Sequence, residues 1–263
     1  MLELIDLDHR LPKDEYRRRL PLLRSRLLQL QQVCWYEGIA SVLVFEGWDG
    51  AGKGDAIRKL TERLEPRGFK MHYIADTPRS YALDLPWMWR FWLATPARGE
   101  MAIFDRSWNR RALVARVEKG ADELAWRRRL RDIVDFERML ADDGTVFIKI
   151  FLHLSKGEQK KRYKKWDKDP ETSWRLEYKD WLMPEKYGFY RGAVEELLEA
   201  TDTAWSPWTI IPATQRRYVR ATVFATVIDR LEEALTARGV SLPEPWISEN
   251  ADADESVSTE NEL

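Results

Sequence analysis

A short apolar run that leads directly into a glycine-rich loop constrains this chain more than any other feature. The run Ser41–Val44 is followed by Phe-Glu-Gly-Trp-Asp-Gly-Ala-Gly-Lys-Gly at 45–54, and then by a stretch with helical periodicity. A strand, a glycine loop and a helix in this order can hold phosphate, because backbone N–H groups and the positive helix end face one anion. The spacing matches Gly-x-x-x-x-Gly-Lys, but Gly54 stands where the usual motif has the Ser or Thr that binds Mg²⁺.

The length and composition of the chain fit a single large α/β domain. With 263 residues, 44% of them hydrophobic, the chain can bury a sizeable core. Cys34 is the only cysteine, which excludes an internal disulfide, and the three His give no Cys/His zinc pattern. No apolar run approaches the roughly 20 residues that span a bilayer, and the N-terminus lacks the apolar core of a secretory signal. We therefore expect a cytoplasmic protein without a membrane partner.

The charge is distributed unevenly along the chain. Residues 249–263 hold six acids and no Lys or Arg, so the net charge of −1 conceals a body, residues 1–248, that carries +5. We expect residues 244–263 to form an acidic, disordered tail. The basic body suits anionic ligands.

Short apolar runs alternate with stretches of helical periodicity. The runs predict strands at 41–45, 71–75, 101–104, 145–152 and 208–211. Helices are predicted at about 12–36, 53–64, 80–94, 122–141, 156–166, 190–200 and 214–236, with Pro21 kinking or splitting the first. This alternation predicts an α/β fold with three α/β/α layers, in which helices cover both faces of a mostly parallel five-stranded sheet. We expect an N-terminal helical segment at 1–37, packed on the core or in a dimer contact, and a main domain at 38–240.

An acid followed by arginines closes the third apolar run. Asp105 is followed by Arg106, and Arg110 and Arg111 come shortly after. An acid after a buried strand beside a phosphate loop is the usual second Mg²⁺ ligand of phosphate-loop enzymes, and the alternative is an Asp that caps the next helix. The glycine loop upstream favours the metal. Because guanidinium groups suit bidentate phosphate contacts, we predict that these three arginines bind nucleotide, with Arg110 and above all Arg106 on phosphate. The alternative is that some of them are ordinary surface residues.

Asp49 offers a substitute for the missing hydroxyl group. An uncompensated carboxylate inside the loop would repel bound phosphate, unless a divalent cation lies between the two. We therefore predict that Asp49 and Asp105 bind Mg²⁺ jointly, directly or through water, with Lys53 and Arg106 as the other catalytic residues. The alternative for Asp49 is a turn-forming role. The residues predicted to bind phosphate in the loop are Gly50, Ala51, Gly52, Lys53 and Gly54.

A strongly basic segment follows the fourth strand. Residues 156–168 contain seven basic and two acidic residues, and four of the lysines share one helical face. Such a face is usually only solvated, but in this place kinases with a phosphate loop carry a lid over the donor. We predict a lid at about 155–180 that suits a donor with many negative charges, bound by Lys161, Arg162, Lys164, Lys165 and Arg175. For Asp76 and Thr77, which follow the second strand, two predictions stand side by side. They line an acceptor pocket, or they belong to an ordinary loop.

Taken together, these motifs resemble the second polyphosphate kinase family, the polyphosphate:nucleotide phosphotransferases. The matching segments are 45–54, Leu64-Glu-Pro-Arg-Gly68, Phe104-Asp-Arg-Ser-Trp108, the basic lid with Asp169-Pro170 and Trp174-Arg-Leu176, and the stretch 201–208. The likeness extends from about residue 12 to 236. The chain departs from the family pattern in two places. It has Asn109-Arg110-Arg111 where many members have Tyr followed by Asn-Arg or Gly-Arg, and its lid is rich in lysine where many relatives use arginine.

The resemblance implies a P-loop kinase fold and a reversible, Mg²⁺-dependent transfer of the terminal phosphate of inorganic polyphosphate. The acceptor would be an adenine or guanine nucleoside mono- or diphosphate, and the variants at 45–49 and 89–92 look most like members that phosphorylate AMP. Asp49 and Asp105 match the essential acids of the family, Lys53 its loop lysine and Arg106 its motif arginine. The family likeness also implies a homodimer or homotetramer.

Two other functions compete with this interpretation. An ATP-dependent nucleotide kinase of the thymidylate kinase type also carries an Asp-Arg pair after a strand, but Gly54 and the excess of lysines near the lid disfavour it. A non-catalytic module could bind nucleotides or nucleic acid through the basic stretch. The intact set of Lys53, Asp49 and Asp105 disfavours that module, so no nucleic-acid partner is expected.

Overall fold

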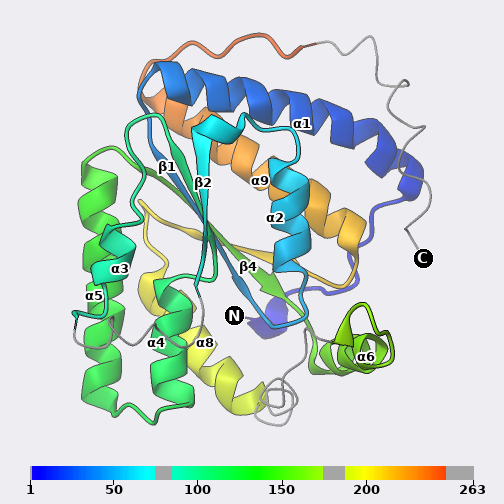
Figure 1. The fold of residues 1–263 in the computed structure, drawn as a ribbon, viewed down its shortest axis with the longest axis vertical. Coiled ribbons are helices and arrows are strands. Elements are labelled where there is room, and N and C mark those ends of the chain that lie inside the picture. Colours follow the sequence, from blue (N-terminus) through cyan, green and yellow to red (C-terminus); the bar gives the residue numbers. More distant parts are fainter. Residues whose placement is uncertain (1, 75–84, 174–186, 247–263) are drawn as a thin grey trace.

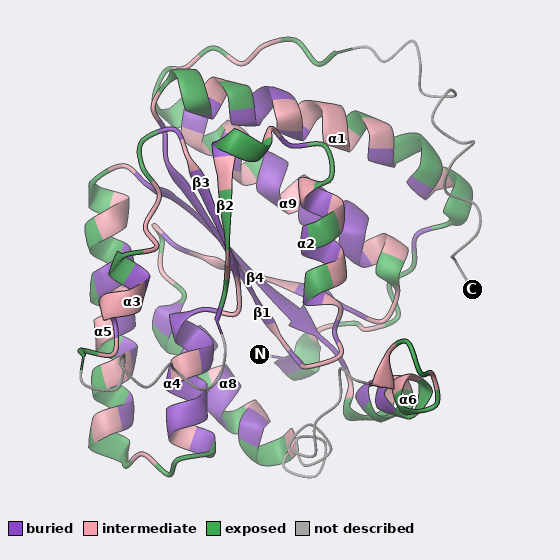
Figure 2. Cartoon of the chain, in the orientation of Figure 1, coloured by how far each residue is buried: buried purple, intermediate pink, exposed green. Residues whose placement is uncertain are grey.

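Five parallel strands form one sheet at the centre of the molecule, whose computed structural model describes residues 2–74, 85–173 and 187–246 (Figure 1). The strands are β1 (Ser41–Gly47), β2 (Phe69–Tyr73), β3 (Met101–Asp105), β4 (Val146–His153) and β5 (Trp208–Pro212). They are ordered β2-β3-β1-β4-β5, and every pairing is parallel. β4 is buried along its whole length and β1 along all but its last residue, as expected for central strands of a sheet covered on both faces (Figure 2).

Helices cover both faces of the sheet, which confirms the predicted three-layer α/β/α fold. The helices are α1 (Lys13–Tyr36), α2 (Lys53–Thr61), α3 (Trp89–Trp92), α4 (Trp108–Val117), α5 (Glu123–Asp142), α6 (Lys156–Asp167), α8 (Tyr187–Thr201) and α9 (Arg216–Ala237), with 3-10 turns at Leu2–Leu4 and Pro66–Gly68. On one face α2 and α9 pack on the strands, and α1 lies alongside α9. On the other face α4, α5 and α8 pack together, and α6 lies beyond the carboxyl end of β4, outside both helical layers (Figure 1).

The N-terminal helix shares the core of the sheet. Leu20, Leu27 and Leu30 of α1 belong to the same buried cluster as the strands. Pro21 lies inside α1, which continues as one helix from Lys13 to Tyr36, so of the two predicted outcomes, a kink or a split, the split does not occur. Proline removes one helical hydrogen bond, and packing of the apolar side of α1 on α9 compensates for that loss.

Two segments differ from the predicted helices. The helix expected at about 80–94 is only the single turn α3 within the described residues of that segment, because Pro86 disfavours helical geometry in the residue before it. A helix that the sequence pattern did not indicate, α4, begins directly after Asp105-Arg106 at the N-cap Ser107. No helix in the described parts of the chain has the length and apolar character needed to cross a membrane.

Candidate active site

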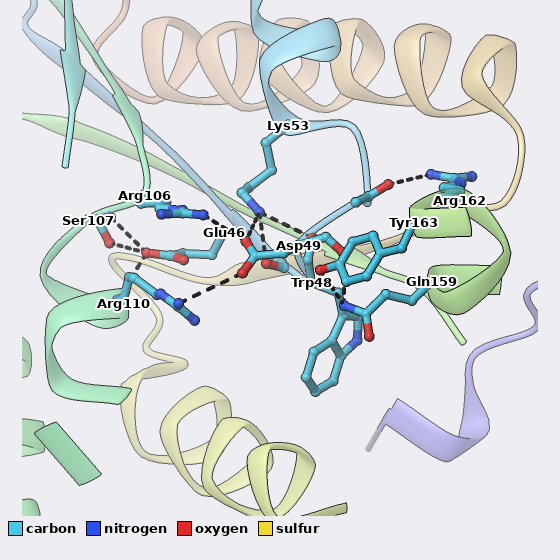
Figure 3. A network of polar contacts seen from close by, with 12 residues as sticks. Glu46, Trp48, Asp49, Lys53, Arg106, Ser107, Arg110, Gln159, Arg162 and Tyr163 are labelled. Atoms are coloured by element: carbon cyan, nitrogen blue, oxygen red, sulfur yellow. Dashed lines mark hydrogen bonds and ion pairs between the residues drawn. The ribbon is translucent and has the colours of Figure 1, made fainter. Parts of the chain in front are cut away.

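The glycine loop meets Arg106, which follows β3, at one edge of the sheet (Figure 3). β1 and β3 are neighbours, and Phe45 pairs with Asp105 in their register. Because both strands are parallel, their carboxyl ends open at the same edge, where ligands bind in open α/β sheets. The loop 48–52 and the pair Asp105-Arg106 therefore lie side by side, as the sequence predicted.

Gly47 allows the phosphate loop to leave the sheet. Its φ of 133° lies in the region that favours glycine, and a Cβ atom there would be only 2.4 Å from the carbonyl oxygen of Leu152 in β4. The next residue, Trp48, donates a 2.8 Å hydrogen bond from Nε1 to Nδ1 of the buried His153. These contacts hold the start of the loop against the end of β4.

Lys53 begins α2 and points back along the loop. Its side chain is only 8% exposed, and its Nζ donates to the carbonyl oxygens of Gly47, at 3.0 Å, and of Trp48, at 3.2 Å. The same Nζ lies 3.6 Å from Oδ1 of Asp49. A buried ammonium group is thus fixed inside the loop where a phosphate group would need it.

Asp49 lies in the middle of a cluster of cations. Its Oδ1 accepts a 2.9 Å hydrogen bond from Nη2 of Arg106, and Nη2 of Arg110 is 3.8 Å from Oδ2. Burial alone would raise the pKa of Asp49, but Arg110, Lys53 and Arg106 outweigh it and hold the pKa well below its usual range. Asp49 is therefore ionised at neutral pH, and the surplus of positive charge around it suits an anionic ligand.

The pKa of Asp105 is shifted in the opposite direction, upward from its usual value. Burial raises the pKa of Asp105, the cations Lys53 and Arg106 lower it, and the charge of Asp49 raises it further. The two carboxylates are thus close enough to repel each other. A cation placed between them would relieve both this repulsion and the cost of burying the Asp105 charge.

The two carboxylates fit a magnesium ion. Oδ2 of Asp49 is buried without a hydrogen-bond partner, so this oxygen has a free lone pair. Within residues 2–74, 85–173 and 187–246, no three His, Cys, Asp or Glu side chains are grouped to hold a metal ion. Mg²⁺ commonly takes only one or two carboxylates from the protein and completes its shell with water and substrate phosphate. The donor set is therefore sufficient for a Mg²⁺–phosphate complex and too small for a permanent structural metal site.

Gly54, which stands in place of the usual hydroxyl residue, lies close to Asp105. A Cβ atom at Gly54 would lie 3.9 Å from Oδ2 of Asp105. The Ser or Thr of the usual motif would therefore point at the Asp105 carboxylate. The glycine leaves that space open next to the predicted metal ligand.

Arg106 carries the only positive φ of a non-glycine residue in the described chain, at 64°. Its backbone N–H donates to the carbonyl oxygen of Phe45 at 3.0 Å, and its guanidinium group is 5.9 Å from the ring centroid of Tyr73. The left-handed backbone turns the chain sharply after β3 and sends the Arg106 side chain toward the loop. Strained residues of this kind cluster at functional sites.

Glu46 is a site residue that the sequence analysis missed. Its carboxylate is 4% exposed and accepts hydrogen bonds from the backbone N–H groups of Ser107 and Arg110 and from Oγ of Ser107. It thereby caps the start of α4 from inside the sheet and fixes the segment that carries Arg106 and Arg110. An acid at the end of a strand whose interior, residues 42–45, is wholly apolar is the signal that would have indicated it.

The remaining predicted residues are placed in different ways. Lys161 is 80% exposed, and Lys164 and Lys165 are also exposed, so these lysines of α6 face solvent. Arg162 on the same helix donates a hydrogen bond to the carbonyl oxygen of Gly50 in the loop. The N–H group of Ala51 donates to the carbonyl oxygen of Trp48. Arg111 is partly exposed on α4. Asp76, Thr77 and Arg175 lie outside the described residues, as do 174–180 of the predicted lid and 247–263 of the predicted tail.

Comparison with known proteins identifies the family of this chain. A family model described as "Polyphosphate kinase 2 (PPK2)" matches residues 10–239. The polyphosphate:AMP phosphotransferase of Pseudomonas aeruginosa is 36% identical over 89% of this chain, and the match covers 47% of that protein. The AMP/ADP-polyphosphate phosphotransferase of Meiothermus ruber is 34% identical over 81% of this chain and 80% of that protein. The chain thus spans about half the length of the Pseudomonas relative.

Solved structures give the same result. The structure titled polyphosphate kinase 2 from Arthrobacter aurescens superposes with a TM-score of 0.85 at 28% identity, over 93% of this chain and 88% of that chain. A putative polyphosphate kinase 2 from Pseudomonas aeruginosa also gives a TM-score of 0.85, at 36% identity, over 89% of this chain and 50% of that chain. Because the family model and these relatives cover most of its length, the chain belongs to the polyphosphate kinase 2 family.

Proposed function

We propose that this protein transfers the terminal phosphate of inorganic polyphosphate to a nucleoside mono- or diphosphate, with AMP or ADP as the favoured acceptor. Relatives named for AMP, for AMP/ADP and for GDP as acceptors support the reaction class. One structural observation carries the proposal. Asp49 and Asp105 stand at the mouth of a phosphate loop, surrounded by Lys53, Arg106 and Arg110.

In this proposal Asp49 and Asp105 hold Mg²⁺. When bound, the ion would neutralise phosphate charge and orient the chain of phosphates. Lys53, Arg106 and Arg110 supply the remaining positive charge around the transferring group. The loop amides and the N-terminus of α2 would contact the non-bridging oxygens of that group.

The exposed lysines of α6 suit the donor. Lys161, Lys164 and Lys165 lie on the solvent side of the helix that begins the predicted lid. A row of ammonium groups attracts a polymer with one charge or more per phosphate better than it attracts a short nucleotide tail. Lysine binds phosphate as a point charge, so we expect tolerance for polyphosphate chains of different register.

The transfer itself needs little acid–base chemistry. An anionic phosphate oxygen of the acceptor attacks the terminal phosphorus of the chain, and the bond from that phosphorus to the next bridging oxygen breaks. The shortened polyphosphate leaves with the electron pair and is stabilised by the same cations. One phosphoanhydride replaces another, so the reaction is expected to run in both directions. Arg106, Arg110 and Arg111 are the proposed nucleotide contacts among the described residues, and Asp76 and Thr77 stay predictions.

A matrix of donors and acceptors tests the proposed function. The purified chain is incubated with polyphosphate or ATP as donor, with AMP, ADP, GMP or GDP as acceptor, and with or without Mg²⁺, and the nucleotides are separated by chromatography. We expect ADP from AMP, or ATP from ADP, with polyphosphate and Mg²⁺ only. Product formation that depends strictly on ATP would instead support a nucleotide kinase of the thymidylate kinase type.

We also propose that the protein works in the cytoplasm as a homodimer or homotetramer. Cys34 is buried, which agrees with a chain that needs no disulfide. Sedimentation of the purified chain tests the oligomer, and cell fractionation tests the compartment. A protein that sediments as a monomer at micromolar concentration would contradict the first part.

A further inference from the structure

The first helix of the predicted lid, α6, lies beside the phosphate loop and is hydrogen-bonded to it (Figure 3). Nε2 of Gln159 donates a 2.8 Å hydrogen bond to the carbonyl oxygen of Asp49. Nη1 of Arg162 donates a 2.8 Å hydrogen bond to the carbonyl oxygen of Gly50. Two consecutive carbonyls of the loop are thus held by side chains one helical turn apart on α6.

Arg162 is built into the fold rather than presented to solvent. Its Nη2 donates to the carbonyl oxygens of Ala213, at 2.7 Å, and Thr214, at 2.9 Å, in the segment after β5. Its Nε donates to Oε1 of Glu158 at 3.1 Å. The Arg162 side chain is 16% exposed, whereas the neighbouring Lys161 side chain is 80% exposed. All three guanidinium nitrogens are therefore already engaged by partners within the fold, whereas the exposed ammonium group of Lys161 forms a 3.7 Å ion pair with Glu158 at the helix surface.

These contacts determine where the loop amides point. In a trans peptide unit the carbonyl and the following N–H group point in opposite directions, and the described chain has no cis peptide bond. Holding the Asp49 carbonyl against α6 therefore directs the N–H group of Gly50 away from α6. The ring of Tyr163 closes the remaining space, since a Cβ atom at Gly50 would lie 3.2 Å from its Cε1 atom.

We infer that Gln159 and Arg162 are positioning residues, which set the peptide orientation of the loop at Asp49 and Gly50, and that Arg162 does not itself bind polyphosphate. This role rests on the proposed phosphotransfer, because the loop is expected to bind phosphate through the Gly50 N–H group that α6 turns outward, while the next N–H group, that of Ala51, donates to the Trp48 carbonyl oxygen inside the loop. The positioning role also divides the basic segment 156–168 into two sides with different tasks. The inner side of α6 holds the loop in shape, and only its outer lysines are available to the donor.

Hydrogen exchange tests the positioning role without reference to turnover. Exchange is measured by mass spectrometry on peptides covering 46–56 in the wild type, Arg162→Met and Gln159→Leu. Arg127→Met is the matched control, because Arg127 is 73% exposed on α5 and pairs only with Glu123 among the described contacts. We expect exchange in the loop to become about tenfold faster in the two α6 variants, with β3 unchanged and with the control equal to wild type.

Kinetics separate positioning from phosphate binding. Arg162→Met is expected to lower kcat by about 10- to 100-fold with little change in the KM for polyphosphate, because a misplaced loop impairs the aligned complex. Lys161→Met is expected to raise that KM and weaken its salt dependence while kcat stays close to wild type. Arg162→Lys should not rescue kcat, since one ammonium group cannot span the carbonyls of Gly50, Ala213 and Thr214.

Two results would overturn the inference. Loop exchange in Arg162→Met and Gln159→Leu that equals wild type would show that α6 does not hold the loop. A rise in the KM for polyphosphate alone in Arg162→Met, as in Lys161→Met, would make Arg162 a phosphate ligand. If Arg162→Met fails to fold, Gln159→Leu provides the same exchange test. A wild-type protein without turnover on polyphosphate contradicts the proposed function, and the exchange result still decides the positioning role.

Discussion

Arg106 and Asp49 join the two halves of the site by a 2.9 Å hydrogen bond between Nη2 and Oδ1. Arg106 follows β3 and Asp49 lies in the loop after β1, so the pair bridges neighbouring strands at their carboxyl ends. The left-handed backbone of Arg106 costs about 1–3 kcal/mol, and such strain persists only where the surroundings enforce it. Asp49 is one of those surroundings, together with the Phe45 carbonyl that accepts from the Arg106 N–H group.

Replacing Asp105 by Asn is expected to separate activity from stability. Turnover should fall by about 100-fold or more, because the variant loses a negative ligand where phosphate charge must be neutralised. The pKa of Asp105 is raised in the folded state, so its ionised form costs stability at pH values above both the folded and the unfolded pKa. The thermal midpoint of the variant at neutral pH should therefore equal or exceed that of wild type. Mg²⁺ should raise the midpoint of wild type more than that of the variant.

Asp143→Asn serves as the control for Asp105→Asn, because the Asp143 side chain is 72% exposed after α5 and distant in sequence from the loop. This variant should match wild type in turnover and in its response to Mg²⁺. Substantial turnover by Asp105→Asn, or an equal Mg²⁺ response in both variants, would contradict the metal assignment.

Asp49→Asn is expected to destabilise the fold in a pH-dependent way. Removal of the charge leaves Lys53, Arg106 and Arg110 without their common counter-ion, which should cost about 3 kcal/mol at neutral pH. The pKa of Asp49 is lowered by folding, so its contribution is complete above the unfolded pKa of about 3.9 and is lost as the pH falls through the folded pKa. Denaturant unfolding of wild type and variant at pH 7 and near pH 3 measures the difference in their free energy of unfolding, which should be smaller at the lower pH. A stability difference between wild type and variant that stays constant over this range would refute it.

Gly47→Ala and Gly54→Ala should change the stability of the protein in different directions. Gly47 combines a φ of 133° with a Cβ position 2.4 Å from the Leu152 carbonyl oxygen, so Ala should destabilise the protein by about 3 kcal/mol or more. Gly54 lies in the first turn of α2, where a Cβ atom would make only an ordinary contact with Asp105. Ala there should be neutral or stabilising by up to about 1 kcal/mol. Chemical denaturation of both variants, with their circular dichroism spectra compared, checks the contrast.

Glu46→Ala is expected to disorder the start of α4. Three buried donors of Ser107 and Arg110 would lose their acceptor, at a cost of about 3 kcal/mol. Turnover should fall as well, because Arg106 and Arg110 are held by this segment. Glu46→Gln keeps one acceptor oxygen and should retain more stability and more turnover. Equal behaviour of the Ala and Gln variants would show that the carboxylate does not cap α4.

Most of the site could be predicted from the chain because its residues lie next to recognisable strands. Asp49, Lys53 and Asp105 follow short apolar runs, and parallel strands bring their carboxyl ends to one edge. The helix α4 could not be predicted in this way, since it is buried on nearly all sides, Asn109 and Arg110 included. A helix without a polar face has no amphipathic period to detect.

The sequence alone thus determined the alternation of strands and helices, the phosphate loop and the family, because these depend on local pattern and spacing. Only the tertiary structure decided which charged side chains face the ligand and which hold the site together. Arg162 and Lys161 are neighbours in one basic run, but the packing of α6 against the loop buries the first and exposes the second. Glu46 likewise acquires its role from the pairing of β1 with β3, which brings Ser107 within hydrogen-bonding distance of a carboxylate 61 residues away.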